Sequence, residues 1–304
     1  MKPRIAVLIS GAGTNLQALI DATQNGQLEA EIVLVVSNRK TAFGLERAKN
    51  AGIPTLYFPL KPYKDAGKSR AEYDTDLAKM LEQHNPDLIV LAGWMHIDSG
   101  AVCQTFLGRI INLHPALPNE FAGAHAIEDA FAAWQQGKIS RSGCMVHHVI
   151  PELDAGEPIV TREVPFIEGD TLESFASRVH EAEHQIIIEA TRKVLENPHI
   201  RFRRIEQYLE NDGEKYTKQM SQDARLHVQS MLEVGEAQMA LESFIYSLAL
   251  EKIDIEHSDT QTIYNFCLLA KLNTEEANVF GAWEVFPSYL NTLGFNPKNP
   301  PANQ

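Results

Sequence analysis

The sequence predicts an α/β fold, a mostly parallel and doubly wound sheet, followed by a small all-α domain. Short apolar runs alternate with segments of helical periodicity from the start of the chain to about residue 195. A Gly-rich turn follows the first apolar run and leads into a helix. Beyond residue 198 the alternation stops and only helical periodicity continues. We therefore expect two domains, over residues 1–198 and 199–304.

The apolar runs of the first domain predict its strands. The run at residues 88–92 is continuously apolar, which is typical of a central strand buried on both faces. We expect the last two strands to run antiparallel. The expected strands are residues 5–10, 31–37, 54–58, 88–92, 109–114, 144–150 and 159–166.

Helical periods fill the intervals between these runs. Tyr73, Leu77 and Leu81 recur at the spacing of one helix face. The expected helices of the first domain are residues 15–24, 43–51, 69–83, 126–135 and 171–195.

The second domain shows helical periods alone. Leu241, Phe244, Ile245, Leu248 and Leu250 have the spacing of a buried stripe. The expected helices are residues 215–234, 236–252, 261–272 and 274–289.

Composition bounds the class of protein. The net charge of −13 argues against a general nucleic-acid binder and against binding to an anionic membrane. Cys103, Cys144 and Cys267 lie far apart, match no metal-ligand spacing and suit a reducing compartment. No apolar run near the N-terminus is long enough for a signal peptide or a membrane span. We expect a cytoplasmic protein without a bound metal.

The strand at residues 109–114 carries the most informative pair. Asn112 and His114 are two residues apart, so they point to the same side of the strand, and Pro115 ends it. The carboxyl edge of such a sheet is where ligands bind. An Asn can donate a hydrogen bond to an oxyanion, and a His can move a proton near neutral pH. A packing role is the ordinary alternative for a strand-end His.

The turn after the first strand contains Gly13, Thr14 and Asn15. It opens a helix, where backbone amides and these side chains can hold a phosphate. It lacks the Lys of a P-loop and the full three-glycine dinucleotide pattern. A tight turn capped by Thr14 or Asn15 remains an equal alternative.

Two further segments carry candidate residues. The segment from Trp94 to Ile97 follows the central strand and could form an apolar wall for a flat ligand. Asp154 lies in a turn between strands, where Asp is common for conformational reasons. A carboxylate there that reached His114 would raise the pKa of the imidazole or hold a water for proton transfer.

Taken together, these motifs resemble one family, phosphoribosylglycinamide formyltransferase. The stretches that carry the resemblance are LISGAGTNLQALIDA, VVSNRKTAFGLERAKNAGIPT, LAGWMHI, INLHPALP, GAHAIEDA and ELDAGEPI. They run in order from residue 4 to about residue 194, and the segment before ELDAGEPI has the length seen in fungi and some bacteria. The resemblance implies an enzyme of purine synthesis that uses 10-formyltetrahydrofolate as co-substrate and needs no metal.

The resemblance also implies roles for individual residues. It assigns catalysis to Asn112, His114 and Asp154. It assigns binding of the phosphorylated amine substrate to Gly13, Thr14, Asn15, Arg70 and Glu183. It assigns folate binding to Met95, His96, Ile97 and Asp98, together with Asn112. The family usually has Met-Arg-Ile-Leu in that folate segment, so His96 removes a fixed cation and Asp98 adds a charge, unless Asp98 caps the following helix.

The implied reaction is direct acyl transfer. The amine of glycinamide ribonucleotide attacks the formyl carbon, and Asn112 and a protonated His114 stabilise the oxyanion. Asp154 raises the pKa of His114 and, through water, helps a proton reach the leaving nitrogen.

Other readings share the same residues. A formyltetrahydrofolate hydrolase would use water in place of the amine, and normally carries an N-terminal regulatory domain. Methionyl-tRNA formyltransferase has a different first turn and a C-terminal RNA-binding barrel, whereas this C-terminal region is helical and acidic. A folate-fold binding module without activity is a third reading. The intact Asn112, His114 and Asp154 argue against it, whereas His96 and Asp98 keep it open. The expected roles of the helical region are self-association, binding of a protein partner, or stabilisation.

Overall fold

The computed structural model describes residues 2–95, 100–197, 200, 202–270, 272 and 281–293. Its backbone contacts divide the chain into one compact unit over Lys2–Asn197 and another over Pro198–Gln304. Within the described ranges, no helix is both long and apolar enough to cross a membrane.

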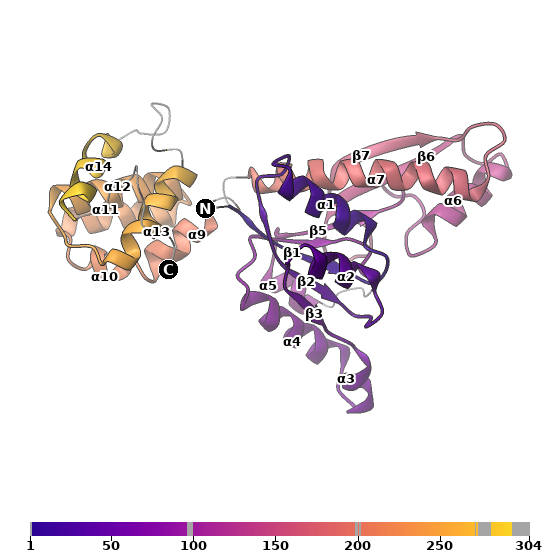
Figure 1. The fold of residues 1–304 in the computed structure, drawn as a ribbon, viewed down its shortest axis with the longest axis horizontal. Helices are drawn as coiled ribbons and strands as arrows, with labels where there is room; N and C mark the ends of the chain where they lie inside the picture. The colour runs from indigo at the N-terminus through magenta and orange to yellow at the C-terminus, as the bar shows by residue number, and fades with distance from the viewer. Residues whose placement is uncertain are drawn as a thin grey trace. The chain divides into compact units, whose positions relative to one another are not determined.

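The first unit is built on a seven-stranded sheet, which Figure 1 shows between two layers of helices. Its strand order is β3-β2-β1-β4-β5-β6-β7, with β1 to β5 parallel and β6 and β7 antiparallel to their neighbours. The strands are β1 (Arg4–Ile9), β2 (Glu31–Ser37), β3 (Thr55–Tyr57), β4 (Leu88–Leu91), β5 (Ile110–His114), β6 (Arg141–His148) and β7 (Pro158–Pro165). The predicted α/β class and mostly parallel sheet are confirmed.

Helices cover both faces of this sheet. On one side, α4 and α5 pack over a core in which Tyr73, Leu77 and Phe106 meet Leu8 and Ile89 of the central strands. On the other side, α7 packs along β5, β6 and β7 and against α1. The helices are α1 (Thr14–Gln24), α2 (Phe43–Asn50), α3 (Lys61–Asp65), α4 (Arg70–Glu82), α5 (Gly100–Thr105), α6 (Ala126–Gln135) and α7 (Leu172–Leu195).

The strand order reverses between β1 and β4. The chain leaves β1 toward β2 and β3, and later returns on the other side of β1 to form β4 and β5. A crevice opens at the carboxyl ends of the strands where a sheet reverses in this way, and ligands bind there. The turns after β1, β4 and β5 meet at this edge, so the topology brings together segments that lie far apart in sequence.

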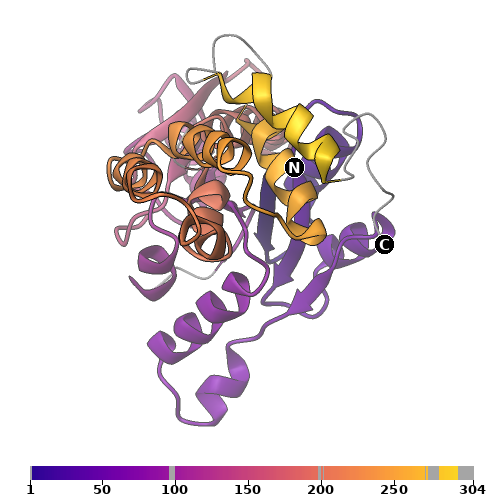
Figure 2. The same ribbon diagram turned by 90° about the vertical axis from the view of Figure 1, so that its left-hand side faces the viewer.

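The elements differ from their predicted extents in a few places. Two short helices, α3 and α5, were not predicted, because each is a single turn or two without a readable period. Strand β6 begins at Arg141, three residues before the predicted start, through pairing with the end of β7. Figures 1 and 2 both show α3 and the start of α4 projecting away from the sheet.

The second unit is helical throughout its described residues. Its core gathers buried side chains around α12, of which Leu241, Phe244, Ile245 and Leu248 are fully buried. Leu250 is 66% exposed, so its predicted place in the buried stripe is wrong, because it lies on the opposite side of α12 from Leu248. The helices are α9 (Arg203–Glu210), α10 (Glu214–Thr217), α11 (Gln222–Glu233), α12 (Ala237–Leu250), α13 (His257–Leu269) and α14 (Ala282–Thr292).

Two predicted helices of this unit differ from the structure. The helix expected over residues 215–234 is split into α10 and α11, because Ser221 begins a new helix by accepting the backbone N–H of Ala224. Much of the helix expected over residues 274–289 lies outside the described residues, and α14 covers its last part and continues to Thr292.

We propose that the first unit is a domain that folds by itself, because its sheet and both helical layers come from its own residues. A chain that ends at Asn197 should unfold cooperatively in urea. Its midpoint should lie near the midpoint of one of the transitions of the full-length chain. Circular dichroism follows the unfolding of the shortened chain and of the full-length chain. Insolubility of the shortened chain, or a gradual non-cooperative transition, would show that the second unit is part of the fold.

Candidate functional site

A cavity of about 770 Å³ lies at the carboxyl edge of the sheet. This volume is in the range of small-molecule sites in enzymes. Its walls come from the turns after β1 and β4, the end of β5, the loop before α6, the β6–β7 turn and one face of α7. Of the residues predicted from the sequence, it is lined by Thr14, Asn15, Met95, Asn112, His114, Asp154 and Glu183.

The turn after β1 is held tightly against α2. Gly13 has a φ of +70°, and a Cβ at this position would lie 2.6 Å from the Cα of Gly44. Only glycine meets both demands without strain. The side chain of Arg47 donates to the carbonyl of Ala12 at 2.9 Å. This packing aims the N-terminus of α1, with Thr14 and Asn15, at the cavity, where its free backbone N–H groups favour an anion.

The turn after β4 is tied to the same edge. The backbone N–H of Met95 donates to the hydroxyl of Ser10 at 2.9 Å, which joins the ends of β4 and β1. Trp94 is buried and Met95 is half exposed, and both line the cavity. The remaining predicted folate-binding residues, His96, Ile97 and Asp98, lie outside the described residues.

Strand β5 delivers Asn112 and His114 to one side of the sheet, as their spacing predicts. His114 is buried, with 4% of its surface exposed. Its Nε2 lies 3.0 Å from the carbonyl oxygen of Phe121, and its Nδ1 lies 3.5 Å from Oδ2 of Asp154. Each ring nitrogen therefore faces an oxygen that accepts hydrogen bonds.

The Asp154 carboxylate contacts groups from several segments of the site. Its Oδ2 accepts the backbone N–H of Gly123 at 3.0 Å, and its Oδ1 accepts Nδ2 of Asn112 at 3.3 Å. Asp154 has a φ of +50°, an uncommon conformation that aims the carboxylate inward from the turn. Burial alone would raise the pKa of Asp154, but contacts with His147, Gly123 and His114 lower it below its usual value.

The protonation of His114 differs from the prediction. Burial lowers the pKa of His114 below its ordinary value of 6.5, and the Asp154 carboxylate and the Phe121 carbonyl only partly offset this. The expected effect of Asp154 on the pKa of His114 is therefore present, but the net shift is downward. The carboxylate acts in the expected direction, but the cost of removing the imidazolium from water is larger.

Helix α7 adds another carboxylate to the cavity wall, that of Glu183. Glu183 is buried and accepts from Nδ1 of His180 at 2.8 Å and from Nδ2 of Asn15 at 3.4 Å. The hydrogen bond to Glu183 raises the pKa of His180. His180 and Glu183 are three residues apart, so they share the face of α7 that lines the cavity.

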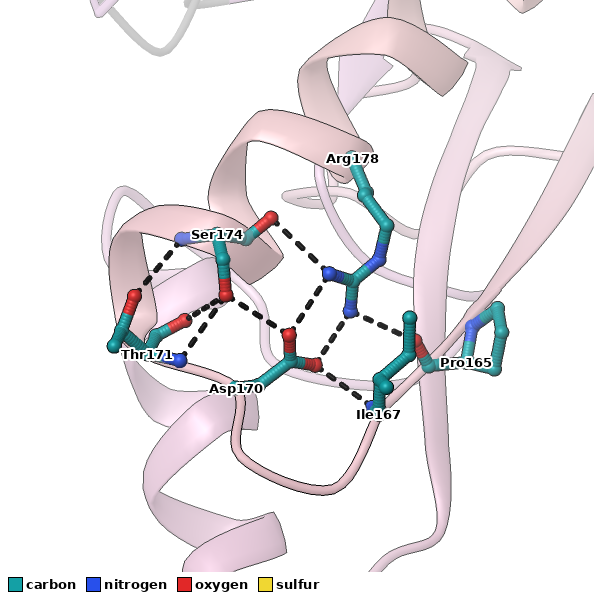
Figure 3. Close-up of polar contacts among 6 residues, drawn as sticks. All are labelled: Pro165, Ile167, Asp170, Thr171, Ser174 and Arg178. Atoms are coloured by element: carbon teal, nitrogen blue, oxygen red, sulfur yellow. Dashed lines mark hydrogen bonds and ion pairs between the residues drawn. The ribbon is translucent and has the colours of Figure 1, made fainter.

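The start of α7 is fixed by the network drawn in Figure 3. Thr171 and Ser174 form a reciprocal capping box. Asp170 accepts from the guanidinium of Arg178 and from the backbone N–H of Ile167, and Arg178 also donates to the carbonyl of Pro165. This network joins the end of β7 to the first turns of α7, so the helix face that carries Glu183 starts from a fixed position.

Arg70 does not line the cavity in the structure. It begins α4, and its Nε lies 2.8 Å from the buried carboxylate of Asp74. Its guanidinium also lies over the ring of Tyr73. A direct role for Arg70 in ligand binding thus stays a prediction.

Two histidines that line the cavity, His147 and His180, were not among the predicted site residues. His147 is buried beside Asn112, with 3.2 Å between its Nε2 and Nδ2 of Asn112. The strand containing His147 was predicted, but its register against β5 cannot be read from one sequence. His180 could have been found from its position three residues before Glu183 on a predicted helix. Over the described parts of the chain, no three His, Cys, Asp or Glu side chains gather as a metal site would require.

Comparison with known proteins gives consistent matches. A family model described as "Formyl transferase" matches residues 3–191. Phosphoribosylglycinamide formyltransferase of Schizosaccharomyces pombe is 50% identical over 64% of this chain and 98% of its own length. Trifunctional purine biosynthetic protein adenosine-3 of Homo sapiens is 42% identical over 61% of this chain and 18% of its own length. The solved structure of glycinamide ribonucleotide transformylase 1 from Symbiobacterium toebii is 39% identical, with a TM-score of 0.58 over 63% of this chain and 86% of that one.

The pKa of His114 offers a test of this geometry. Replacing Asp154 with Asn removes the attraction of the carboxylate for the imidazolium, so Asp154→Asn should lower the pKa of His114 further. The asparagine oxygen can still accept the Gly123 N–H. NMR titration of the ring protons measures the change, and Glu152→Gln, in the same turn, should leave the pKa of His114 where it is. An unchanged or raised pKa in Asp154→Asn would contradict the contact.

The same lowered pKa has a consequence for stability. In the unfolded chain His114 takes up a proton near pH 6.5, whereas in the folded protein it does so only at lower pH. Its contribution to the free energy of unfolding is therefore fully present above pH 6.5 and is lost as the pH falls toward the pKa of the folded state.

Proposed function

The chain belongs to the formyl transferase family, and from this premise we propose that Asn112, His114 and Asp154 carry out its reaction with 10-formyltetrahydrofolate as the formyl donor. The chain transfers a formyl group to the amine of glycinamide ribonucleotide, a step of purine biosynthesis. One observation supports this catalytic set. The Asp154 carboxylate lies 3.3 Å from the Asn112 amide nitrogen and 3.5 Å from Nδ1 of His114, and all three side chains line the cavity.

The N-terminus of α1, together with Glu183, suits the amine substrate. The N-terminus of α1, at Thr14 and Asn15, supplies backbone N–H groups and the positive end of the helix dipole for a phosphate. The buried carboxylate of Glu183 lies beside Asn15 and can accept a hydrogen bond from the amine, which orients its lone pair. This local arrangement binds an anionic substrate in spite of the net charge of −13.

The apolar part of the cavity suits the folate. Leu91, Trp94, Val149 and Leu153 contribute to its walls, next to Met95. Apolar and aromatic side chains of this kind bury a flat ring system. We propose that this wall, with the segment from Met95 to Asp98, holds the pterin of the donor.

We assign the following steps to the residues. The amine nitrogen of the substrate attacks the formyl carbon, and Asn112 donates an N–H to the oxygen as it becomes negative. An imidazole with a lowered pKa is a base at neutral pH, so His114 takes the proton that leaves the attacking amine. The imidazolium stabilises the oxyanion, with Asp154 beside it. The bond from the formyl carbon to the donor nitrogen then breaks, and that nitrogen receives the proton.

The second unit has a different role in this proposal. None of the residues assigned to chemistry or substrate binding lies beyond Glu183. We infer that the helical unit serves association, with a second copy or with another protein partner. The cysteines at 103, 144 and 267 are free and buried, which suits the reducing cytoplasm that we propose as the location.

An assay with glycinamide ribonucleotide and 10-formyltetrahydrofolate tests the assignment. The purified protein should form the formylated ribonucleotide, and His114→Ala should reduce kcat by about 10²- to 10⁴-fold, because both proton transfer and oxyanion stabilisation are lost. His227→Ala, on the exposed surface of α11, should keep wild-type turnover.

A reaction without the ribonucleotide measures hydrolysis of the donor. Hydrolysis at the rate of the complete reaction would assign the site to a hydrolase, and wild-type turnover in His114→Ala would contradict the catalytic assignment.

A further inference from the structure

We propose that His147 is a positioning residue for formyl transfer, because its imidazole determines which way the Asn112 amide faces. The inference deepens the proposed function and rests on the role of Asn112 in it. His147 has 2% of its surface exposed and lines the cavity.

The sheet register places His147 directly opposite Asn112. The two residues are partners in the antiparallel pairing of β5 with β6. The pairing of β6 with β7 is irregular between Val146 and His147, at the point where His147 points into the site. Such irregularities redirect single side chains, and they are frequent next to active sites.

A backbone carbonyl fixes the proton on the ring of His147. Nδ1 lies 2.8 Å from the carbonyl oxygen of His148, which can only accept a hydrogen bond. Nδ1 therefore carries a proton and donates it. In the neutral imidazole, Nε2 is then an acceptor, and Oδ1 of Asp154 lies 3.7 Å from it, which is beyond hydrogen-bond distance.

The turn after β6 keeps that carbonyl in place. The backbone N–H of His148 donates to the carbonyl of Glu157 at 3.0 Å. A Cβ on Gly156 would lie 1.7 Å from the carbonyl oxygen of His148 and 3.2 Å from Nδ1 of His147. Only a glycine lets the chain pass so close to this hydrogen bond.

The acceptor at Nε2 determines the orientation of the Asn112 amide. The NH₂ group of Asn112, and not its oxygen, must face Nε2 at 3.2 Å, and its second hydrogen then points to Oδ1 of Asp154 at 3.3 Å. At rest this hydrogen bonds to Asp154, and during attack it is shared with the developing oxyanion. A reversed amide would present its oxygen there and repel the negative charge.

Two substitutions separate this role from simple packing. His147→Leu replaces the imidazole with an apolar side chain of similar length that has no hydrogen-bond acceptor. It should reduce kcat by about 10- to 100-fold, while both KM values stay within about 2-fold of wild type. His147→Gln can place its side-chain oxygen near the position of Nε2, and it should recover most of the lost kcat. Equal losses in both variants, or a loss in KM alone, would overturn the proposal.

A double-mutant cycle adds a test through Asn112. In an Asn112→Ala background, His147→Leu should cause no further loss of kcat, because the group it positions is gone. Additive losses would show that His147 acts by another route. Wild-type protein without formyl transfer would contradict the proposed function itself, and would leave the geometric part of the inference to the next measurement.

The tautomer is measurable without turnover. Nitrogen-15 NMR of the histidine rings should show His147 protonated at Nδ1 and bare at Nε2, and the side-chain NH₂ signals of Asn112 should move in His147→Leu. A ring protonated at Nε2 alone, or unmoved Asn112 signals, would overturn the inference whatever the activity.

Discussion

The carboxylate of Asp154 is the interaction on which the site depends. One oxygen faces Asn112 and the other faces His114, and the backbone N–H of Gly123 is bonded to it as well. These groups come from β5, from the loop before α6 and from the β6–β7 turn. One buried anion therefore joins three segments and balances the partial positive charges around it. Without it, the amide and the imidazole would have no common partner at this edge of the sheet.

This arrangement places strain at the proposed catalytic site. Asp154 and Phe121, which lie on either side of His114, both have positive φ values, 50° and 42°. Such conformations cost about 1–3 kcal/mol each and persist where the surrounding structure determines them. The buried sheet, with helices on both faces, supplies that surrounding structure. The sheet and its helices thus hold the two turns in their unfavourable conformations, and each ring nitrogen of His114 faces an acceptor as a result.

The sequence predicted the parts of this site that depend on local periodicity. The i and i+2 spacing of Asn112 and His114 on an apolar strand places them together, and the sheet class follows from the alternation of elements. Distances across the sheet could not be read in this way. His147 was missed because its role depends on register. The net lowering of the pKa of His114 was not foreseen, because it depends on how deeply the ring is buried. Arg70 begins a helix as expected, yet in the structure it contacts Asp74 rather than the cavity.

We propose that Asp154 acts in the chemical step, and the kinetics of Asp154→Asn test that role most directly. The variant keeps the shape of the side chain and removes its charge. We expect kcat to fall by at least about 100-fold, with the KM for glycinamide ribonucleotide and for the folate within about 3-fold of wild type. An unchanged kcat with a raised KM would contradict the account, because it would make Asp154 a residue of substrate binding alone.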